Sequence, residues 1–194
     1  MTPPIRILAF AGSSRRESLN KKLVHVAAEG ARAAGAEVTV LDLLDVAMPI
    51  YDGDLETSTG IPESARRFKQ LLLAHQGLLI ASPEYNSSIS GVLKNAIDWA
   101  SRAEPGEQAL ACFDGKVAGL VAASPGPLGG LRGLVTLRSI LGNIRVVVLP
   151  EQVTVAKAHE AFDDEGRLRD AKQADSVRKV GARVAVVAAL LNAS

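Results

Sequence analysis

Short, almost wholly apolar runs that alternate with helical patterns constrain the fold of this chain more than any other feature. Gly77–Ala81 and Val117–Val121 contain no polar side chain, and Val146–Leu149 follows the same pattern. Strands of this composition are typical of parallel sheets, because helices cover both of their faces. We therefore expect all three segments in the middle of such a sheet.

Strand and helix patterns alternate along the whole chain, which indicates βαβ units. Strands are expected near residues 5–10, 37–42, 77–82, 116–123 and 144–149. Helices are expected over residues 19–31, 62–76, 91–103, 131–142 and 177–191. The connection 150–172 carries no assignable pattern, and the connection 44–61 carries turn residues. Five strands with five helices favour a flavodoxin-like three-layer α/β sandwich over a six-stranded dinucleotide fold. We expect a five-stranded parallel sheet in the order 2-1-3-4-5, with helices on both faces.

Composition and charge exclude several classes of protein. The formal net charge is +1, so no strong field would attract nucleic acid or an anionic membrane. The single cysteine, Cys112, excludes an internal disulfide and a zinc site built on several cysteines. His25, His75 and His159 lack the spacing of metal ligands, so we predict no metal site.

The length of 194 residues fits one domain that spans residues 1–194. Met1-Thr2-Pro3-Pro4 leads directly into a strand pattern, without a targeting signal. The last apolar run, Val184–Leu191, is much shorter than the roughly 20 residues of a membrane-spanning helix. We therefore expect a cytoplasmic protein.

The loop after the first expected strand has the composition of a phosphate site. A helix follows it, and the N–H groups at a helix start favour an anion. Further donors are the side chains of Ser13, Arg15, Ser18 and Asn20. The loop has a single glycine and no Gly-Lys-Ser/Thr, so it is neither a dinucleotide turn nor a P-loop. We interpret it as a monophosphate site; the alternative is an N-capped helix after a solvated loop.

A second polar loop follows the apolar run at 77–81. Pro83 stiffens its path, Glu84 and Asn86 add hydrogen-bonding groups, and Tyr85 can pack against a flat conjugated ring. Taken alone, such a loop could equally be a rigid turn. Its place at the carboxyl end of a strand is where doubly wound folds bind ligands.

A third loop, residues 124–130, contains Ser124, Gly126 and Gly129 after the fourth expected strand. Glycine allows the backbone to approach a ligand closely. In a doubly wound sheet the ends of the first, third and fourth strands share one crevice. A monophosphate at the first loop and a ring between the other two describe FMN.

These segments together resemble the NADPH-dependent FMN reductase family, flavodoxin-like reductases that include quinone, azo-dye and chromate reductases. The matching segments are Gly12-Ser13-x-Arg15-x-x-Ser18-x-Asn20, Pro83-Glu84-Tyr85-Asn86 through Gly91-x-Leu93-Lys94-Asn95-Ala96-Ile97-Asp98-Trp99, and Ser124-x-Gly126-x-x-Gly129-Gly130. Their order and separation cover most of the chain, and the middle motif is highly specific.

The resemblance implies roles for individual residues. Ser13, Arg15, Ser18 and Asn20 fall where the family binds the FMN phosphate. Residues 83–86 fall where it binds the isoalloxazine ring, and 124–130 flanks that ring from the other side.

Two further features of the middle motif need a separate interpretation. Ser90 stands where relatives commonly have proline; serine can still cap a helix, so we expect altered loop stiffness and no loss of flavin binding. Lys94, Asn95, Asp98 and Trp99 are interpreted as packing and hydrogen-bonding residues, behind the flavin loop or at a subunit contact. No side chain is predicted to be catalytic.

The resemblance also implies an activity: an FMN-dependent NAD(P)H oxidoreductase that passes electrons to a small-molecule acceptor by a ping-pong mechanism. Quinone, azo, metal-oxyanion and free-flavin acceptors all remain open, as does the choice between NADPH and NADH. We expect segment 44–61 and Tyr85 to wall the crevice, and a homodimer or homotetramer to form.

Two alternatives belong to other classes of protein. A flavodoxin-type FMN electron carrier, or a regulatory flavin-binding module, would lack NAD(P)H turnover, but carriers rely on an acidic docking surface that a charge of +1 does not provide. A phospho-receiver would need acidic residues at the first strand end, where this chain has Ala11-Gly12-Ser13.

Overall fold

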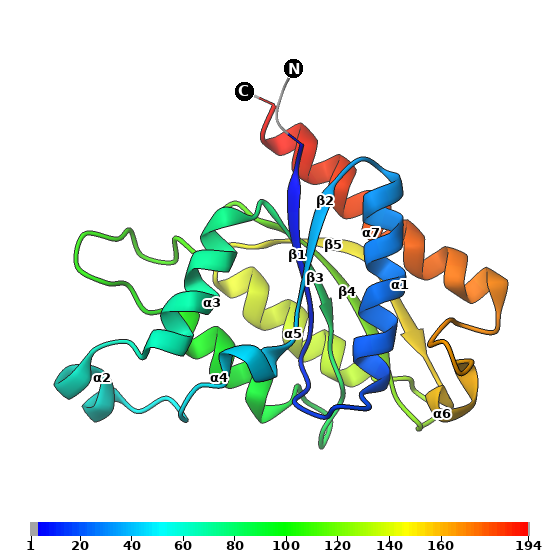
Figure 1. Cartoon of the computed structure of the whole chain (residues 1–194), viewed down its shortest axis with the longest axis horizontal. Coiled ribbons are helices and arrows are strands. Elements are labelled where there is room, and N and C mark those ends of the chain that lie inside the picture. Colours follow the sequence, from blue (N-terminus) through cyan, green and yellow to red (C-terminus); the bar gives the residue numbers. More distant parts are fainter. Residues whose placement is uncertain (1–3, 194) are drawn as a thin grey trace.

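The computed structural model describes residues 4–193. These residues form a five-stranded parallel sheet in the order β2-β1-β3-β4-β5, with helices on both faces (Figure 1). The expected flavodoxin-like topology is therefore confirmed. In the part of the chain described, no helix is long and apolar enough to cross a membrane. Residues 1–3, on which the expected absence of a targeting signal partly rests, lie outside it.

The elements follow the predicted alternation. The strands are β1 (Arg6–Ala11), β2 (Glu37–Leu41), β3 (Gly77–Ala81), β4 (Val117–Ala123) and β5 (Val147–Val155). The α-helices are α1 (Leu19–Ala33), α2 (Gly53–Thr59), α3 (Glu63–Ala74), α4 (Gly91–Ala100), α5 (Leu131–Asn143), α6 (Ala158–Ala161) and α7 (Ala171–Leu191), and a short 3-10 helix covers Leu43–Val46.

Alternate residues of the inner strands face two separate cores. Ile7 and Ala9 of β1 pack in the core that α1 and α7 complete, whereas Leu8 and Phe10 pack in the core that α3, α4 and α5 complete. This separation follows from the two-residue period of a strand. Every residue of β3 and β4 is buried, so these two apolar runs do lie in the middle of the sheet.

The same expectation is wrong for Val146–Leu149. These residues belong mostly to β5, which lies at the edge of the described sheet, and Val147 is 45% exposed. The strand also continues past Pro150 as far as Val155. Proline fits an edge strand because its missing N–H group need not pair with a neighbour. A register shift between Ala118 and Leu120 of β4 accompanies this irregularity.

The connection 44–61, where turn residues were expected, contains most of the 3-10 helix and the whole of α2. Helix α2 has no buried residue and projects from the body of the molecule (Figure 1). Two residues of α4 hold the stretch of chain that precedes α2. Asn95 Oδ1 accepts a hydrogen bond from Tyr51 N at 2.8 Å, and Trp99 Nε1 donates to Pro49 O at 2.8 Å. Asn95 and Trp99 do form hydrogen bonds, as expected from the sequence, but with segment 44–61. Lys94 and Asp98 instead pair with each other on the surface of α4.

A close contact between α1 and α7 gives a test of the packing. A Cβ atom on Gly181 would lie 1.9 Å from Ala27 O, whereas one on Gly142 of α5 would meet nothing within 4 Å. We predict that Gly181→Ala lowers the free energy of unfolding by roughly 1–3 kcal/mol, because the helices must separate. Gly142→Ala should leave it unchanged or raise it by up to about 1 kcal/mol. Urea unfolding measures both, and equal effects would contradict the close contact.

Candidate functional site

Three loops meet at the carboxyl edge of the sheet: the first loop (residues 12–18), the second loop (82–90) and the third loop (124–130) (Figure 1). The backbone hydrogen bonds between neighbouring strands continue into the first residues of these loops. Gly12 N donates to Ala81 O at 2.9 Å, and Ser82 N donates to Val121 O at 2.9 Å. Neighbouring strands thus bring the three loops together at one edge, as a doubly wound sheet requires.

A pocket of about 80 Å³ lies between these loops. Most of the residues proposed from the sequence line it: Ser13, Arg15, Ser18, Asn20, Pro83, Glu84, Tyr85 and Ser124. Three further lining residues, Leu19, Ala123 and Pro125, were not proposed, since their side chains carry no group that indicates a ligand. Asn86, Gly126 and Gly129 lie outside the lining.

The start of α1 has the properties of an anion site. Ser18 occupies the N-cap with extended backbone, yet within the described chain its side chain makes no capping hydrogen bond. By contrast, Asp52, Ser90 and Asp170 each cap the helix that follows them. The first-turn N–H groups of α1 are thus left without the usual side-chain acceptor, beside a pocket that Ser13, Ser18 and Arg15 also line. A phosphate would supply that acceptor, so the residues present fit the terminal group of FMN.

Asn20 joins the first helix to the end of β4. Its Nδ2 donates to Ala123 O at 2.8 Å, and its Oδ1 accepts from Ala123 N at 2.9 Å. Asn20 is 3% exposed, so both bonds are shielded from water. An amide has two N–H donors, which leaves one for a ligand. Holding the site together is therefore a role of Asn20 that the sequence analysis missed.

Glu84 joins the second loop to the start of α5. Its carboxylate, 8% exposed, accepts hydrogen bonds from Arg132 N at 3.0 Å and Arg132 Nε at 2.7 Å. Burial alone would raise the pKa of Glu84, but the hydrogen bonds from Arg132 and Gly133 outweigh it and hold that pKa below its ordinary value. The carboxylate is therefore ionised at neutral pH and committed to α5.

Tyr85 lies at the rim of the pocket on a tight turn. Tyr85 N donates to Ser88 O at 2.9 Å and Ser88 N donates to Tyr85 O at 3.0 Å. The two residues between them, Asn86 and Ser87, have φ values of 51° and 66°. Positive φ at both positions defines a type I′ turn, which asparagine tolerates well. Asn86 thus shapes the loop, while Tyr85, 50% exposed, is open to a flat ligand.

The glycines of the third loop determine its path. Gly129 has a φ of 61°, and a Cβ atom there would lie 2.9 Å from Ala156 N. Gly126 N donates to Ser124 Oγ at 3.2 Å, which closes a local turn. The two glycines therefore shape the loop that carries Ser124 and Pro125, without lining the pocket themselves.

Segment 44–61 was expected to wall the crevice, but it does not line this pocket. Within the described part of the chain, the pocket takes no residue from this segment, whereas Tyr85 does line it. Segment 44–61 packs instead along α3 and α4, through Met48, Tyr51 and Leu55 among others.

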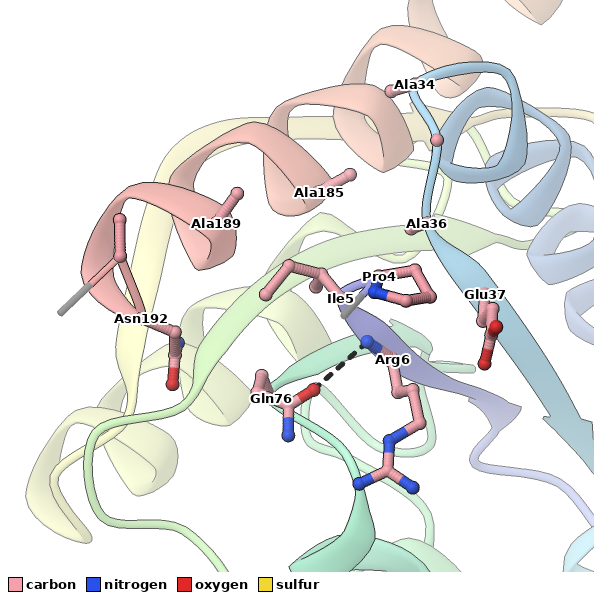
Figure 2. Close-up of a pocket in the computed structure, with 12 residues that line it drawn as sticks. Pro4, Ile5, Arg6, Ala34, Ala36, Glu37, Gln76, Ala185, Ala189 and Asn192 are labelled. Carbon is pink, nitrogen blue, oxygen red and sulfur yellow. Dashed lines mark hydrogen bonds between the residues drawn. The ribbon is translucent and has the colours of Figure 1, made fainter. Parts of the chain in front are cut away.

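A larger cavity, about 740 Å³, lies at the opposite edge of the sheet (Figure 2). It is bounded by the start of β1, where Arg6 N donates to Gln76 Oε1 at 3.0 Å, and by Ala34 and Asn192. Ala34 and Asn192 are the C-caps of α1 and α7. Helix carboxyl ends carry partial negative charge, so this cavity disfavours a phosphate. The smaller pocket is therefore our candidate for the anion site.

The sheet order, with a polar pocket at the carboxyl edge, defines a flavodoxin-like α/β protein. Comparison with known families identifies the particular family: a family model described as "NADPH-dependent FMN reductase" matches residues 5–160. The chain belongs to this family. It is therefore an oxidoreductase of the FMN-dependent, NAD(P)H-using class, which decides against the electron-carrier alternative.

Individual relatives agree with this assignment. The chain is 37% identical to an NAD(P)H-dependent FMN reductase of Pseudomonas aeruginosa, over 92% of each protein. It is 35% identical to a 2-hydroxy-1,4-benzoquinone reductase of a Burkholderia species, over 82% of each. Among solved structures, a flavoenzyme NAD(P)H:(acceptor) oxidoreductase of Paracoccus denitrificans superposes with a TM-score of 0.75 at 29% identity, covering 94% of this chain and 96% of the other.

The role assigned to Glu84 predicts a pH-dependent loss of stability. Glu84→Gln should lower the free energy of unfolding by about 1–2 kcal/mol at pH 7, because its charge-assisted hydrogen bonds to the start of α5 are weakened. The pKa of Glu84 is lowered from 4.5 in the folded protein, so its stabilisation is complete above pH 4.5. The difference between the variant and the parent should therefore disappear as the pH falls through that lowered value.

Chemical unfolding of the flavin-free protein at several pH values measures this difference. The matched control is Glu63→Gln, since Glu63 is an exposed glutamate in the first turn of α3. A difference for Glu84→Gln that stays constant down to the lowest pH at which the protein remains folded, or an equal effect of the control, would contradict the proposed contact between Glu84 and α5.

Proposed function

We propose that the three loops bind FMN, with its phosphate in the pocket at the start of α1. The uncapped first turn of α1, together with Ser13, Ser18 and the Arg15 guanidinium, carries this proposal. Asn20 would both offer its remaining N–H and hold the helix against β4. These groups match a dianionic terminal phosphate better than any neutral group, because all of them can donate.

The pocket volume supports a particular orientation of the cofactor. About 80 Å³ is well below the roughly 300–1,000 Å³ of sites that enclose a whole ligand. We therefore assign the pocket to the phosphate end only. The ring would lie along the rim, between the second loop with Pro83, Glu84, Tyr85 and Asn86 and the third loop with Ser124, Gly126 and Gly129. The exposed face of Tyr85 supports this placement.

The chemistry needs no acid or base from this chain. Bound FMN supplies hydride acceptance from NAD(P)H and electron donation to the second substrate. The nearby carboxylate, Glu84, is committed to α5, and Asn20 is committed to Ala123. Side chains of the site therefore bind and orient the cofactor. We propose a ping-pong order in which NAD(P)H and the acceptor use the same rim in turn.

A quinone is the acceptor class we favour, since relatives over most of the chain are named quinone reductases; azo compounds, metal oxyanions and free flavin remain further candidates. We also propose that residues 1–194 act as one domain, in the cytoplasm, as a homodimer or homotetramer. The family resemblance supports the assembly, and the single cysteine is compatible with a reducing compartment.

The purified full-length protein tests this function directly. We expect it to bind FMN, to bleach under anaerobic addition of NADPH or NADH, and to recover its colour when a benzoquinone is added. Steady turnover with parallel initial-rate lines would support the ping-pong order. A protein that cannot be reconstituted with FMN would overturn the proposal.

Arg15 and its neighbour form a matched pair of variants. Both side chains are exposed, but only Arg15 lines the pocket. Loss of a charge-assisted hydrogen bond predicts that Arg15→Ala weakens FMN binding by roughly tenfold to a hundredfold. Arg16→Ala should change the affinity for FMN by less than about threefold, because Arg16 can act on the phosphate only through a weak long-range charge effect. Fluorescence titration of flavin-free protein measures both, and unfolding midpoints confirm that neither alters the fold.

A further inference from the structure

Ser90 makes a hydrogen bond that helix capping does not require. As the N-cap of α4, its Oγ accepts a hydrogen bond from Leu93 N at 3.2 Å. The same hydroxyl donates to Gly12 O in the first loop at 2.6 Å. Ser90 is 2% exposed, so both bonds are shielded from water. One buried hydroxyl thus connects the end of the second loop to the beginning of the first.

The hydrogen bond from Ser90 fixes the start of the first loop, because Gly12 is also held by the sheet. Gly12 N donates to Ala81 O, and a Cβ atom on Gly12 would lie 2.7 Å from Leu93 Cδ2. The first loop therefore begins in close contact with α4, held on one side by the sheet and on the other by Ser90. A carbonyl fixed in this way fixes the whole peptide unit that it belongs to.

The Gly12 carbonyl shares its peptide unit with Ser13 N. This unit is trans, so its C=O and N–H groups point in opposite directions. With the carbonyl turned toward Ser90, the Ser13 N–H is turned away from α4. Ser13 itself is 4% exposed and lines the pocket at the start of α1.

We propose that Ser90 is a positioning residue that aims the Ser13 N–H at the phosphate of the bound cofactor. This inference rests on the proposed FMN site and adds a specificity to it. Ser90 lies outside the pocket lining, so it acts only through Gly12. Its effect should therefore depend on the phosphate group and be absent for a flavin without one.

Binding of FMN and of riboflavin to flavin-free protein separates this role from a general effect on folding. Ser90→Ala should weaken FMN binding about fivefold to tenfold, the loss expected for one hydrogen bond, and leave riboflavin affinity within twofold. Ser90→Thr keeps a hydroxyl and should retain most of the preference for FMN.

Ser90→Pro is a second variant without the hydroxyl, and it keeps the test decisive if Ser90→Ala fails to fold. Ser90 has a φ of −69°, which proline adopts without strain, so this variant should keep the start of α4 while it loses the hydroxyl and the backbone N–H of residue 90. It should show the same selective loss of FMN affinity as Ser90→Ala. The control is Asp170→Ala, which removes the N-cap of α7 and should leave the ratio of FMN to riboflavin affinity unchanged.

Two results would overturn the inference while leaving the FMN site intact: unchanged affinity for both flavins in Ser90→Ala and Ser90→Pro, or an equal loss of affinity for both flavins. Failure of the parent protein to bind FMN would overturn the proposed function as well, so the two failures are distinguishable.

Discussion

A single side chain, the Asn20 amide, satisfies both backbone groups of Ala123, which lies 103 residues further along the chain. Ala123 is 3% exposed, and a buried backbone group without a partner costs roughly 1–3 kcal/mol. The amide therefore fixes the start of α1 against the third loop. Ser90 and Glu84 make the corresponding connections between the first and second loops and between the second loop and α5. Contacts within the chain thus hold the geometry of the site, and a site held by its own contacts lowers the entropic cost of binding.

Much of the fold could be predicted because burial on both faces leaves a clear mark on the sequence. β3 and β4 are wholly apolar, and they are the strands that helices cover completely. The same reasoning misplaced Val146–Leu149, since an edge strand packed on helices can be as apolar as an inner one. Pro150 concealed the rest of β5, because the cost of a proline depends on whether its neighbour needs the missing N–H, and that is a property of the sheet.

The location of the pocket was predictable from the sequence, whereas the contacts made by each residue that lines it were less so. Asn20 and Glu84 were proposed as cofactor contacts because an amide and a carboxylate in a loop suit a polar ligand. The same groups suit buried backbone donors, and the structure engages them there. Ser90 was expected to cap α4, and it does. Its bond to Gly12 spans 78 residues, a tertiary contact without any local signal in the sequence.

In the proposed arrangement, this division of roles has a consequence for the chemistry. The most buried polar groups of the site, at Ser13, Ser18 and Asn20, surround the position assigned to the phosphate, which takes no part in electron transfer. Binding energy is thus drawn from a group remote from the reacting ring, and it does not require the ring itself to be enclosed. A ring held at a rim beside the half-exposed Tyr85 leaves a face open to flat acceptors of differing outline. Substrate breadth then follows from where the affinity resides, because a shallow rim has few contacts with which to reject one acceptor in favour of another.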